Sequence, residues 1–302
     1  MSKPDRLLGC FLGGAIGDAW GSAYEHQVEQ DEDTYYPFGQ PELVERTWQL
    51  TDDTQLTAAT LEAIVTAGGV DAEAIANRMM EWYKARRIVG IGASTLKAMQ
   101  ELAQGNHYNQ VGRKGEYGAG NGAAMRIAPL AFVGSVNNDL IREVSRITHH
   151  NDEAYAGARS VVLAIRATLH EQWDGNSNLV DILLPQLPDT RVRDRLIEVS
   201  KISDLVDIAG LGNSGYVVDS VPLAIAAANQ VRKIGITGMY KTLINIGGDT
   251  DTNCAIAGQV AGALLGASAL PERLVSRVNQ LSGFDVFYRA VRDFEGWLSD
   301  DI

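Results

Sequence analysis

The chain has 302 residues, of which 45% are hydrophobic, enough to bury one large core or two small ones. Its 26 basic and 38 acidic residues leave a formal charge of −12, which argues against nucleic-acid binding through broad contact with phosphates. The two cysteines, Cys10 and Cys254, lie among small apolar residues, so we expect buried reduced thiols and no disulfide framework.

The first predicted helix covers residues 6–23 and has a glycine at every fourth position, which gives one face a smooth ridge for close packing. The glycines are Gly9, Gly13, Gly17 and Gly21. Lys3 and Arg6 precede this apolar run, as in a signal peptide, but the glycine spacing and Asp18 argue against export. The run is also too short to span a bilayer. We therefore expect a cytoplasmic protein without a membrane partner.

Helical periodicity dominates the remainder of the chain. Residues 54–67 are predicted to form a helix that Gly68-Gly69 ends, and Asp71 opens the next one. Further helices are predicted at 152–169, 190–209, 217–230 and 252–267, with two short ones within 271–297. Loops are predicted at 26–50, 105–123, 171–189 and 244–251, and the acidic and aromatic loop 26–50 is expected to form a surface lid. No repeat or linker divides the chain, so the predicted fold is all-α, a compact helical bundle in a single domain of residues 1–302.

Two acidic segments each precede a predicted helix. They are Thr51-Asp52-Asp53-Thr54 and Gly247-Gly248-Asp249-Thr250-Asp251-Thr252. Either segment alone is explained by helix capping, because Thr and Asp are favoured at the start of a helix. Together they offer oxygen ligands that suit Mg²⁺, Mn²⁺ or Ca²⁺, and none of the five histidines has the paired spacing of a zinc site. The sequence therefore predicts a site for two hard divalent cations.

A glycine-rich segment, Gly118-Ala-Gly120-Asn121-Gly122-Ala-Ala-Met-Arg126, leads into a predicted helix. Such a segment lets backbone N–H groups approach a phosphate or pyrophosphate, and a tight turn between helices is the alternative. It is not a P-loop, because no Gly-Lys-Ser/Thr follows, and no strand precedes it as in a dinucleotide fingerprint.

Three further positions carry polar groups near predicted helix ends. His149 precedes the helix at 152–169, where a histidine satisfied within its loop is the alternative to a ligand contact. Glu25 follows the first helix, and either Glu25 or Asp18 is a candidate metal ligand or general base, with a solvated surface glutamate as the alternative for Glu25. Tyr216 stands at a helix entrance, in a segment without the G-x-S-x-G pattern of serine hydrolases.

Taken in order, these segments resemble the ADP-ribosylglycohydrolase family, the group that includes dinitrogenase-reductase-activating glycohydrolase. The resemblance covers nearly the whole chain, and the ordered set of short motifs is specific. The motifs are a loose Gly-Asp-Ala-x-Gly-x-x-x-Glu pattern over 14–25, Thr-Asp-Asp-Thr-Gln at 51–55, Gly-Ala-Gly-Asn-Gly-Ala-Ala-Met-Arg at 118–126, Thr-His at 148–149, Ser-Gly-Tyr-Val at 214–217 and Gly-Gly-Asp-Thr-Asp-Thr at 247–252.

The resemblance implies an all-helical fold with two Mg²⁺ or Mn²⁺ ions at the floor of a cleft. Position by position, it implies metal ligands at Thr51, Asp52, Asp53, Asp249, Asp251 and Thr252. It implies substrate contacts at Gly120, Asn121, Gly122, His149 and Tyr216, with the first three receiving the ADP-ribose phosphates. Glu25 matches a glutamate near the metals, and our hypothesis is that Glu25 or the metal-bound Asp53 manages the proton.

The activity that the resemblance implies is metal-dependent hydrolysis, which removes ADP-ribose from a modified protein side chain, with ADP-ribosyl-arginine as the first expectation. One departure from the family pattern bears on the identity of the scissile bond. Several relatives have an Asp-x-Gly-Asn-Thr-like stretch, whose acidic and amide positions align with Gly90 and Ala93 of this chain. An immunity protein that neutralises an ADP-ribosyltransferase toxin, by hydrolysis or by occluding its active site, is the alternative. A non-catalytic protein of the crystallin type is disfavoured, since all the acidic positions are present.

Overall fold

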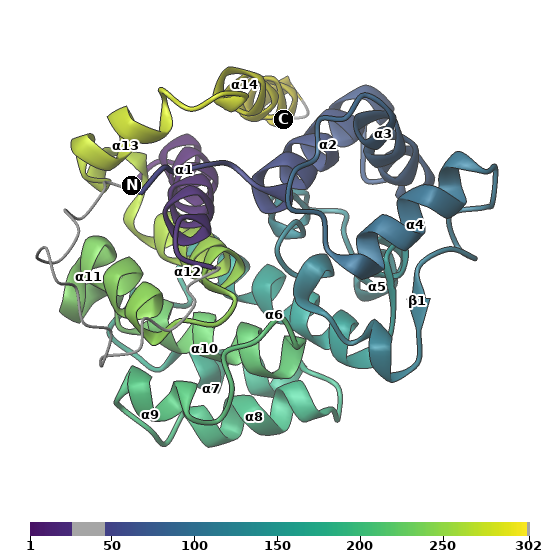
Figure 1. Ribbon diagram of the computed structural model, residues 1–302. Coiled ribbons are helices and arrows are strands. Elements are labelled where there is room, and N and C mark those ends of the chain that lie inside the picture. The colour runs from purple at the N-terminus through teal and green to yellow at the C-terminus, as the bar shows by residue number, and fades with distance from the viewer. Residues whose placement is uncertain (26–45, 301–302) are drawn as a thin grey trace, which may run out of the picture.

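The computed structural model describes residues 1–25 and 46–300, and these residues are almost entirely helical, so the predicted all-α fold class is confirmed (Figure 1). Most predicted helices are present, with ends within about three residues of the predicted ones. They are α1 (Lys3–Ser22), α2 (Asp52–Ala67), α3 (Ala72–Lys84), α6 (Asp152–Leu169), α10 (Val217–Asn229), α12 (Thr250–Leu265), α13 (Glu272–Val278) and α14 (Phe284–Asp300). The predicted surface lid lies mostly outside the described residues, which exclude 26–45.

The predicted helix at residues 190–209 is wrong in its extent. The structure has two helices there, α8 (Arg191–Val199) and α9 (Leu205–Ala209). The break has a local cause, because the side chain of Asp204 accepts a hydrogen bond from the backbone N–H of Val206 and so starts a new helix.

Several elements were not predicted, since their sequence patterns are short or interrupted. They are α4 (Ala93–Ala103), α5 (Asn138–Arg146), α7 (Leu179–Leu183), α11 (Val231–Ile246), the 3₁₀ helices η1 (Glu116–Gly118), η2 (Asn121–Ala123), η3 (Ala128–Phe132), η4 (Leu184–Gln186) and η5 (Ala267–Ala269), and the strands β1 (Arg113–Lys114) and β2 (His149–His150). Within α11, Gly235 has a φ of 70°, which separates two helical segments and breaks the periodicity. The parallel strands β1 and β2 have two residues each, too few to show an alternating pattern.

The glycine ridge of α1 packs directly on α12, as predicted. A Cβ atom added at Gly17 would lie 2.2 Å from the carbonyl oxygen of Cys254, so the two backbones touch without intervening side chains. The hydroxyl of Tyr240 donates a 2.7 Å hydrogen bond to the carbonyl oxygen of Gly13 and ties α11 to this pair. Cys10 and Cys254 are both buried and free, as expected.

The α1–α12 pair lies near the centre of the molecule, with α2, α3 and α4 on one side and α8, α9 and α10 on another (Figure 1). The helices α6 and α10 pack on α12, and α14 packs on α2. Because α12 begins where α1 ends, the start of α12, the end of α1 and the start of α2 meet at one place. The acidic segments predicted to bind metal occupy those helix starts.

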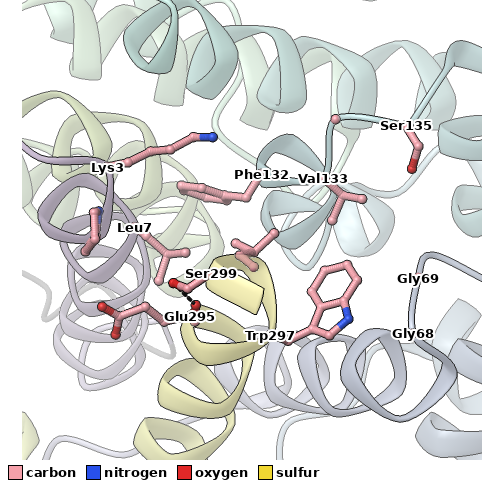
Figure 2. Close-up of a pocket in the computed structure, with 13 residues that line it drawn as sticks. Lys3, Leu7, Gly68, Gly69, Phe132, Val133, Ser135, Glu295, Trp297 and Ser299 are labelled. Atoms are coloured by element: carbon pink, nitrogen blue, oxygen red, sulfur yellow. Dashed lines mark hydrogen bonds between the residues drawn. The ribbon is translucent and has the colours of Figure 1, made fainter. Parts of the chain in front are cut away.

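A cavity of about 480 Å³ lies away from that meeting point, where the start of α1 approaches α14 (Figure 2). Lys3, Leu7, Phe132 and Trp297 contribute to its walls, and none of the predicted site residues does. Among the described residues, no helix is both long and apolar enough to cross a membrane.

Candidate active site

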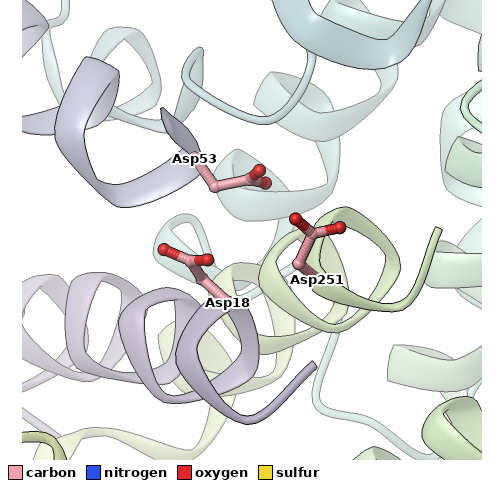
Figure 3. Close-up of side chains that lie close together, drawn as sticks. All are labelled: Asp18, Asp53 and Asp251. Atoms are coloured by element: carbon pink, nitrogen blue, oxygen red, sulfur yellow. The ribbon is translucent and has the colours of Figure 1, made fainter. Parts of the chain in front are cut away.

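Three buried carboxylates from three different helices point toward one another (Figure 3). Asp18 comes from α1, Asp53 from α2 and Asp251 from α12, and one oxygen of each lies within 4.8 Å of the others. The close α1–α12 packing sets the separation of Asp18 and Asp251, since both follow directly from residues in that contact. The structure therefore brings the two predicted acidic segments together and adds Asp18 to them.

Asp18 caps the start of α2 from outside that helix. One of its oxygens accepts a 2.6 Å hydrogen bond from Thr51 Oγ1, and the other accepts bonds from the N–H and hydroxyl of Thr54. The backbone N–H of Thr51 also points to this carboxylate. With its oxygens engaged in this way, Asp18 orients the metal-binding segment at 51–54. The sequence suggested Asp18 as a metal ligand or general base but not as a helix cap, because Asp18 and helix α2 are far apart in the chain.

Helix capping does not account for the acidic segments. Thr51 and Asp249 occupy the N-cap positions of α2 and α12, and neither uses its side chain to cap its own helix. The side chains of Thr51 and Asp249 therefore have partners other than their own helices.

Asp53 carries the observation that best fits a metal ion. Its Oδ2 accepts a 3.2 Å hydrogen bond from Thr252 Oγ1, whereas its Oδ1 is buried and has no hydrogen-bond partner among the described residues. A buried carboxylate oxygen without a partner is costly, because it has lost its hydration and gained nothing in return. A hard divalent cation would satisfy this oxygen, and the all-oxygen surroundings match its preference.

A second acidic group shares Asp251 with the first. Glu25, Asp249 and Asp251 each place an oxygen within 4.8 Å of the others. Asp249 is held by Asn121, whose Nδ2 donates a 2.7 Å hydrogen bond to Asp249 Oδ2. Asp52 stands nearby and accepts a bond of 3.4 Å from the N–H of Gly92. Three of the predicted ligands, Asp53, Asp249 and Asp251, thus fall into two adjoining groups that share Asp251.

Burial of these acids, together with their proximity, raises their pKa values. Burial, followed by the charges of neighbouring carboxylates, raises the pKa of Asp52 to about 8 and that of Asp251 to about 12. The same causes raise the pKa of Asp53 well above its ordinary value. Without a cation, several of these groups hold protons at neutral pH, so binding a cation must release protons.

This arrangement predicts that the metal-free protein becomes less stable as the pH rises. The folded-state pKa of Asp52 lies above its ordinary value of 3.8, so the folded state binds the proton more tightly than the unfolded state. The stabilising contribution is present at low pH and is lost as the pH rises from about 4 through about 8. We expect thermal denaturation in EDTA to give a lower melting temperature at about pH 8 than at about pH 5.5.

Magnesium is the matched comparison for that experiment. Because the cation replaces the protons, we expect it to raise the melting temperature more at the higher pH. An equal shift at both pH values would show that the buried acids do not bind the ion.

A cleft of about 520 Å³ opens beside the carboxylates. It is lined by most of the predicted site residues, namely Glu25, Asp52, Gly120, Asn121, Gly122, His149, Asp249, Asp251 and Thr252. Lining residues that were not predicted are Gly92, Ser94, Thr95, Met125, Asn213, Ser214, Gly215 and Gly248. Thr51 and Asp53 lie behind this surface, both buried.

The glycine-rich segment forms one wall of the cleft, where it pairs with the chain before α10. The N–H of Asn121 donates to the carbonyl oxygen of Gly215, and Gly120 forms an antiparallel bridge with Tyr216. The side chain of Tyr216 does not line the cleft, because its hydroxyl accepts a 3.4 Å hydrogen bond from Arg191 at an exposed position. Its predicted contact with substrate stays a prediction.

The ring of His149 explains why the segment needs glycine. A Cβ atom at Gly120 would lie 2.9 Å from His149 Nε2, and one at Gly122 would lie 2.9 Å from His149 Cε1. The glycines therefore make room for the imidazole, a reason that the sequence pattern alone did not reveal.

The two positions that depart from the family pattern, Gly90 and Ala93, both line the cleft. Ala93 is the first residue of α4, and Gly92 before it offers no side-chain cap. The cleft therefore meets an uncapped helix start here, where relatives are expected to have an acidic and an amide side chain.

A family model described as ADP-ribosylglycohydrolase matches residues 1–300 of this chain. The chain belongs to the ADP-ribosylglycohydrolase family. It is 29% identical to the ADP-ribosylarginine hydrolase Tri1 of Pseudomonas putida, over 91% of this chain and 74% of that protein. It is 26% identical to the ADP-ribosyl-[dinitrogen reductase] glycohydrolase of Rhodospirillum rubrum, over 92% of each chain.

The fold is that of an ADP-ribosylglycohydrolase by structural comparison as well. A solved structure described as an ADP-ribosylglycohydrolase-related protein complex superposes with a TM-score of 0.67 at 28% identity, covering 97% of this chain and 98% of that one. The predicted family is therefore confirmed, and its motifs meet around one cleft.

Proposed function

We propose that this chain hydrolyses the bond between ADP-ribose and a modified protein side chain, and that it requires two divalent cations, Mg²⁺ or Mn²⁺. The observation that carries the proposal is Asp53 Oδ1, which is buried and has no hydrogen-bond partner among the described residues. It belongs to one of two carboxylate groups that share Asp251, next to a cleft of about 520 Å³. Family membership and the names of both relatives support the substrate class.

The predicted ligands would hold the cations at the meeting point of α1, α2 and α12. They are Thr51, Asp52, Asp53, Asp249, Asp251 and Thr252. When bound, the cations supply Lewis-acid stabilisation of charge on ribose oxygens and a lowered pKa for an attacking water. Their total charge of four offsets the repulsion among the carboxylates, and this fits the raised pKa values of Asp52 and Asp251.

The remaining steps belong to the protein's own groups. Glu25, exposed at the cleft mouth and within 4.8 Å of Asp249 and Asp251, is placed to take a proton from water that enters from solvent. Asp53 is the second candidate, although its burial leaves it less accessible. The segment at 120–122 gives the ADP-ribose phosphates a wall free of Cβ atoms at two of its three positions.

The proposed scissile bond is that of ADP-ribosyl-arginine. The relative from Pseudomonas putida is named for that substrate, and its similarity extends over 91% of this chain. Gly90 and Ala93 have no side chain that could protonate the leaving group, so the general acid must be another residue of the cleft. Glu25 fits this task better than the more deeply buried acids.

A release assay tests the proposal. Free ADP-ribose is measured from arginine-, serine- and glutamate-linked substrates, with EDTA and with Mg²⁺ or Mn²⁺ restored. We expect release from the arginine-linked substrate that EDTA abolishes and that added metal restores. Absence of release from all three substrates would refute the proposed function, and preference for another linkage would refute only the bond.

The toxin-binding alternative stays a prediction. It depended on the loop at 26–50, and residues 26–45 lie outside the part of the chain that the structure describes. Protection of cells by an Asp249→Ala variant would favour it, because occluding a toxin needs no metal.

A further inference from the structure

Behind the cleft wall, a buried arginine is linked to His149 through one hydroxyl group. Arg126 is fully buried, and its Nη2 donates hydrogen bonds to Thr148 Oγ1 at 2.9 Å and to the carbonyl oxygen of Val144 at 3.2 Å. Thr148 Oγ1 lies 2.8 Å from His149 Nδ1. Thr148 is also completely buried, so water has no access to its hydroxyl.

The direction of these hydrogen bonds follows from a count of protons. A guanidinium group only donates, so Thr148 Oγ1 accepts from Arg126. The hydroxyl proton of Thr148 then needs an acceptor, and among the described residues His149 Nδ1 is its one remaining neighbour. If His149 Nδ1 carried a proton instead, the hydroxyl proton would be buried without an acceptor, which is costly. The arrangement that gives the Thr148 hydroxyl proton an acceptor is therefore Arg126 to Thr148 to His149 Nδ1.

From this we propose that Arg126 and Thr148 hold His149 in the neutral tautomer with its proton on Nε2, so that His149 donates a hydrogen bond to an anionic oxygen of the substrate. A neutral imidazole with Nδ1 engaged as an acceptor has its proton on Nε2. His149 lines the cleft, and its Nε2 is the ring atom nearest to a Cβ built at Gly120. His149 therefore serves as a donor and not as the general base, and Arg126 and Thr148 are positioning residues.

Strand pairing fixes the backbone from which the His149 ring extends. His149 pairs with Arg113 in the parallel β1–β2 ladder, and the carbonyl oxygen of Thr148 accepts a 3.1 Å hydrogen bond from the N–H of Arg113. Gly112 lies so close that an added Cβ atom would stand 2.7 Å from the same carbonyl oxygen. The position of the His149 backbone is therefore set by strand pairing, and its ring lies against Gly120 and Gly122.

The charge of Arg126 also opposes a second proton on the ring. Burial, followed by the positive charges of Arg126 and Arg113, lowers the pKa of His149 to about 3. The Nε and Nη1 groups of Arg126 are buried and have no hydrogen-bond partner among the described residues, so its charge is not offset by a carboxylate there. A neutral donor suits a phosphate oxygen of ADP-ribose, and this part of the inference rests on the proposed function.

The tautomer is measurable without any substrate. In protein labelled with ¹⁵N at histidine, the two-bond ¹⁵N–¹H correlations of the His149 ring distinguish a proton on Nε2 from one on Nδ1, with His149→Gln assigning the signals. We expect the Nε2–H pattern, unchanged between about pH 5.5 and pH 8. An Nδ1–H pattern, or an imidazolium in this range, would overturn the proposal, whatever the enzyme assays show.

The positioning role is tested with Thr148→Val, which keeps the shape of the side chain and removes the hydroxyl. We expect both tautomers to be populated and the Kd for ADP-ribose to rise about 10- to 100-fold, the range typical of groups that orient a metal-ligating histidine. Thr148→Ser is the matched control, since it restores the hydroxyl and is expected to keep the Nε2–H pattern. A pure Nε2–H pattern in Thr148→Val would refute the role of Thr148.

Binding of ADP-ribose separates this inference from the proposed function. If wild-type protein shows the Nε2–H pattern but calorimetry detects no binding of ADP-ribose in the presence of Mg²⁺, the tautomer assignment stands and the proposed substrate is wrong. If ADP-ribose binds and Thr148→Val binds it equally well, the donor role is refuted and the proposed function stands.

Discussion

Asp251→Asn is expected to lower the rate of ADP-ribose release by on the order of 10³-fold with Mg²⁺ present, comparable to the loss of a group that stabilises transition-state charge directly. Asp251 belongs to both acidic groups, and asparagine keeps its shape while removing one negative charge from the set. Its Oδ1 can still accept the 2.8 Å hydrogen bond from the N–H of Thr252. The measurement is turnover of arginine-linked substrate at saturating metal.

The same variant separates loss of function from loss of folding. Burial and the neighbouring carboxylates raise the pKa of Asp251 to about 12, so this side chain is already neutral in the metal-free protein, and asparagine should leave the melting temperature in EDTA close to that of the wild type. The increase in melting temperature on adding Mg²⁺ should shrink. Asp139→Asn, at an exposed position in the first turn of α5, is the control and should leave both properties unchanged. Full turnover in Asp251→Asn would refute the assignment of Asp251 as a metal ligand.

Gly17→Ala is expected to lower the free energy of unfolding by about 2–4 kcal/mol, because overpacking a close contact costs more than the added helix propensity gains. The new Cβ atom would lie 2.2 Å from the Cys254 carbonyl oxygen and 2.9 Å from Ala255 N, so α1 must move away from α12. We expect the melting temperature to fall by roughly 5–10 °C. Because Asp18 follows directly, activity should fall as well, even below the melting transition.

Gly296→Ala is the matched control for this substitution. Gly296 also lies inside a helix, α14, and an added Cβ atom there would meet nothing within 4 Å. Helix propensity alone then applies, and it favours alanine by up to about 1 kcal/mol. If the two substitutions change the free energy of unfolding in opposite directions, the loss in Gly17→Ala is due to packing of α1 on α12. Equal changes would contradict this explanation.

The positions of the helices show where sequence patterns suffice. Glycine at every fourth position predicted both helix α1 and its close packing against another helix, because the residues that share one face of a helix are set by their local spacing. The prediction failed at 190–209, where Asp204 restarts the helix, and at α11, where Gly235 interrupts the pattern. A single capping group or a single positive φ outweighs periodicity in such short segments.

The sequence by itself determined the all-α class, the family and the two acidic segments, because periodicity, composition and short ordered motifs are written in consecutive residues. Only the tertiary structure decided which groups meet. Asp18 accepts hydrogen bonds from Thr51, the N-cap residue of α2, at a separation of 33 residues, and Asp53 accepts a bond from Thr252 at a separation of 199 residues. The Arg126 and Thr148 contact spans 22 residues. Helix packing determines which of these distant residues come into contact, and no periodic pattern in the sequence reports it. The contacts among the acidic segments and the chain of hydrogen bonds from Arg126 through Thr148 to His149 could therefore be found only in the folded structure.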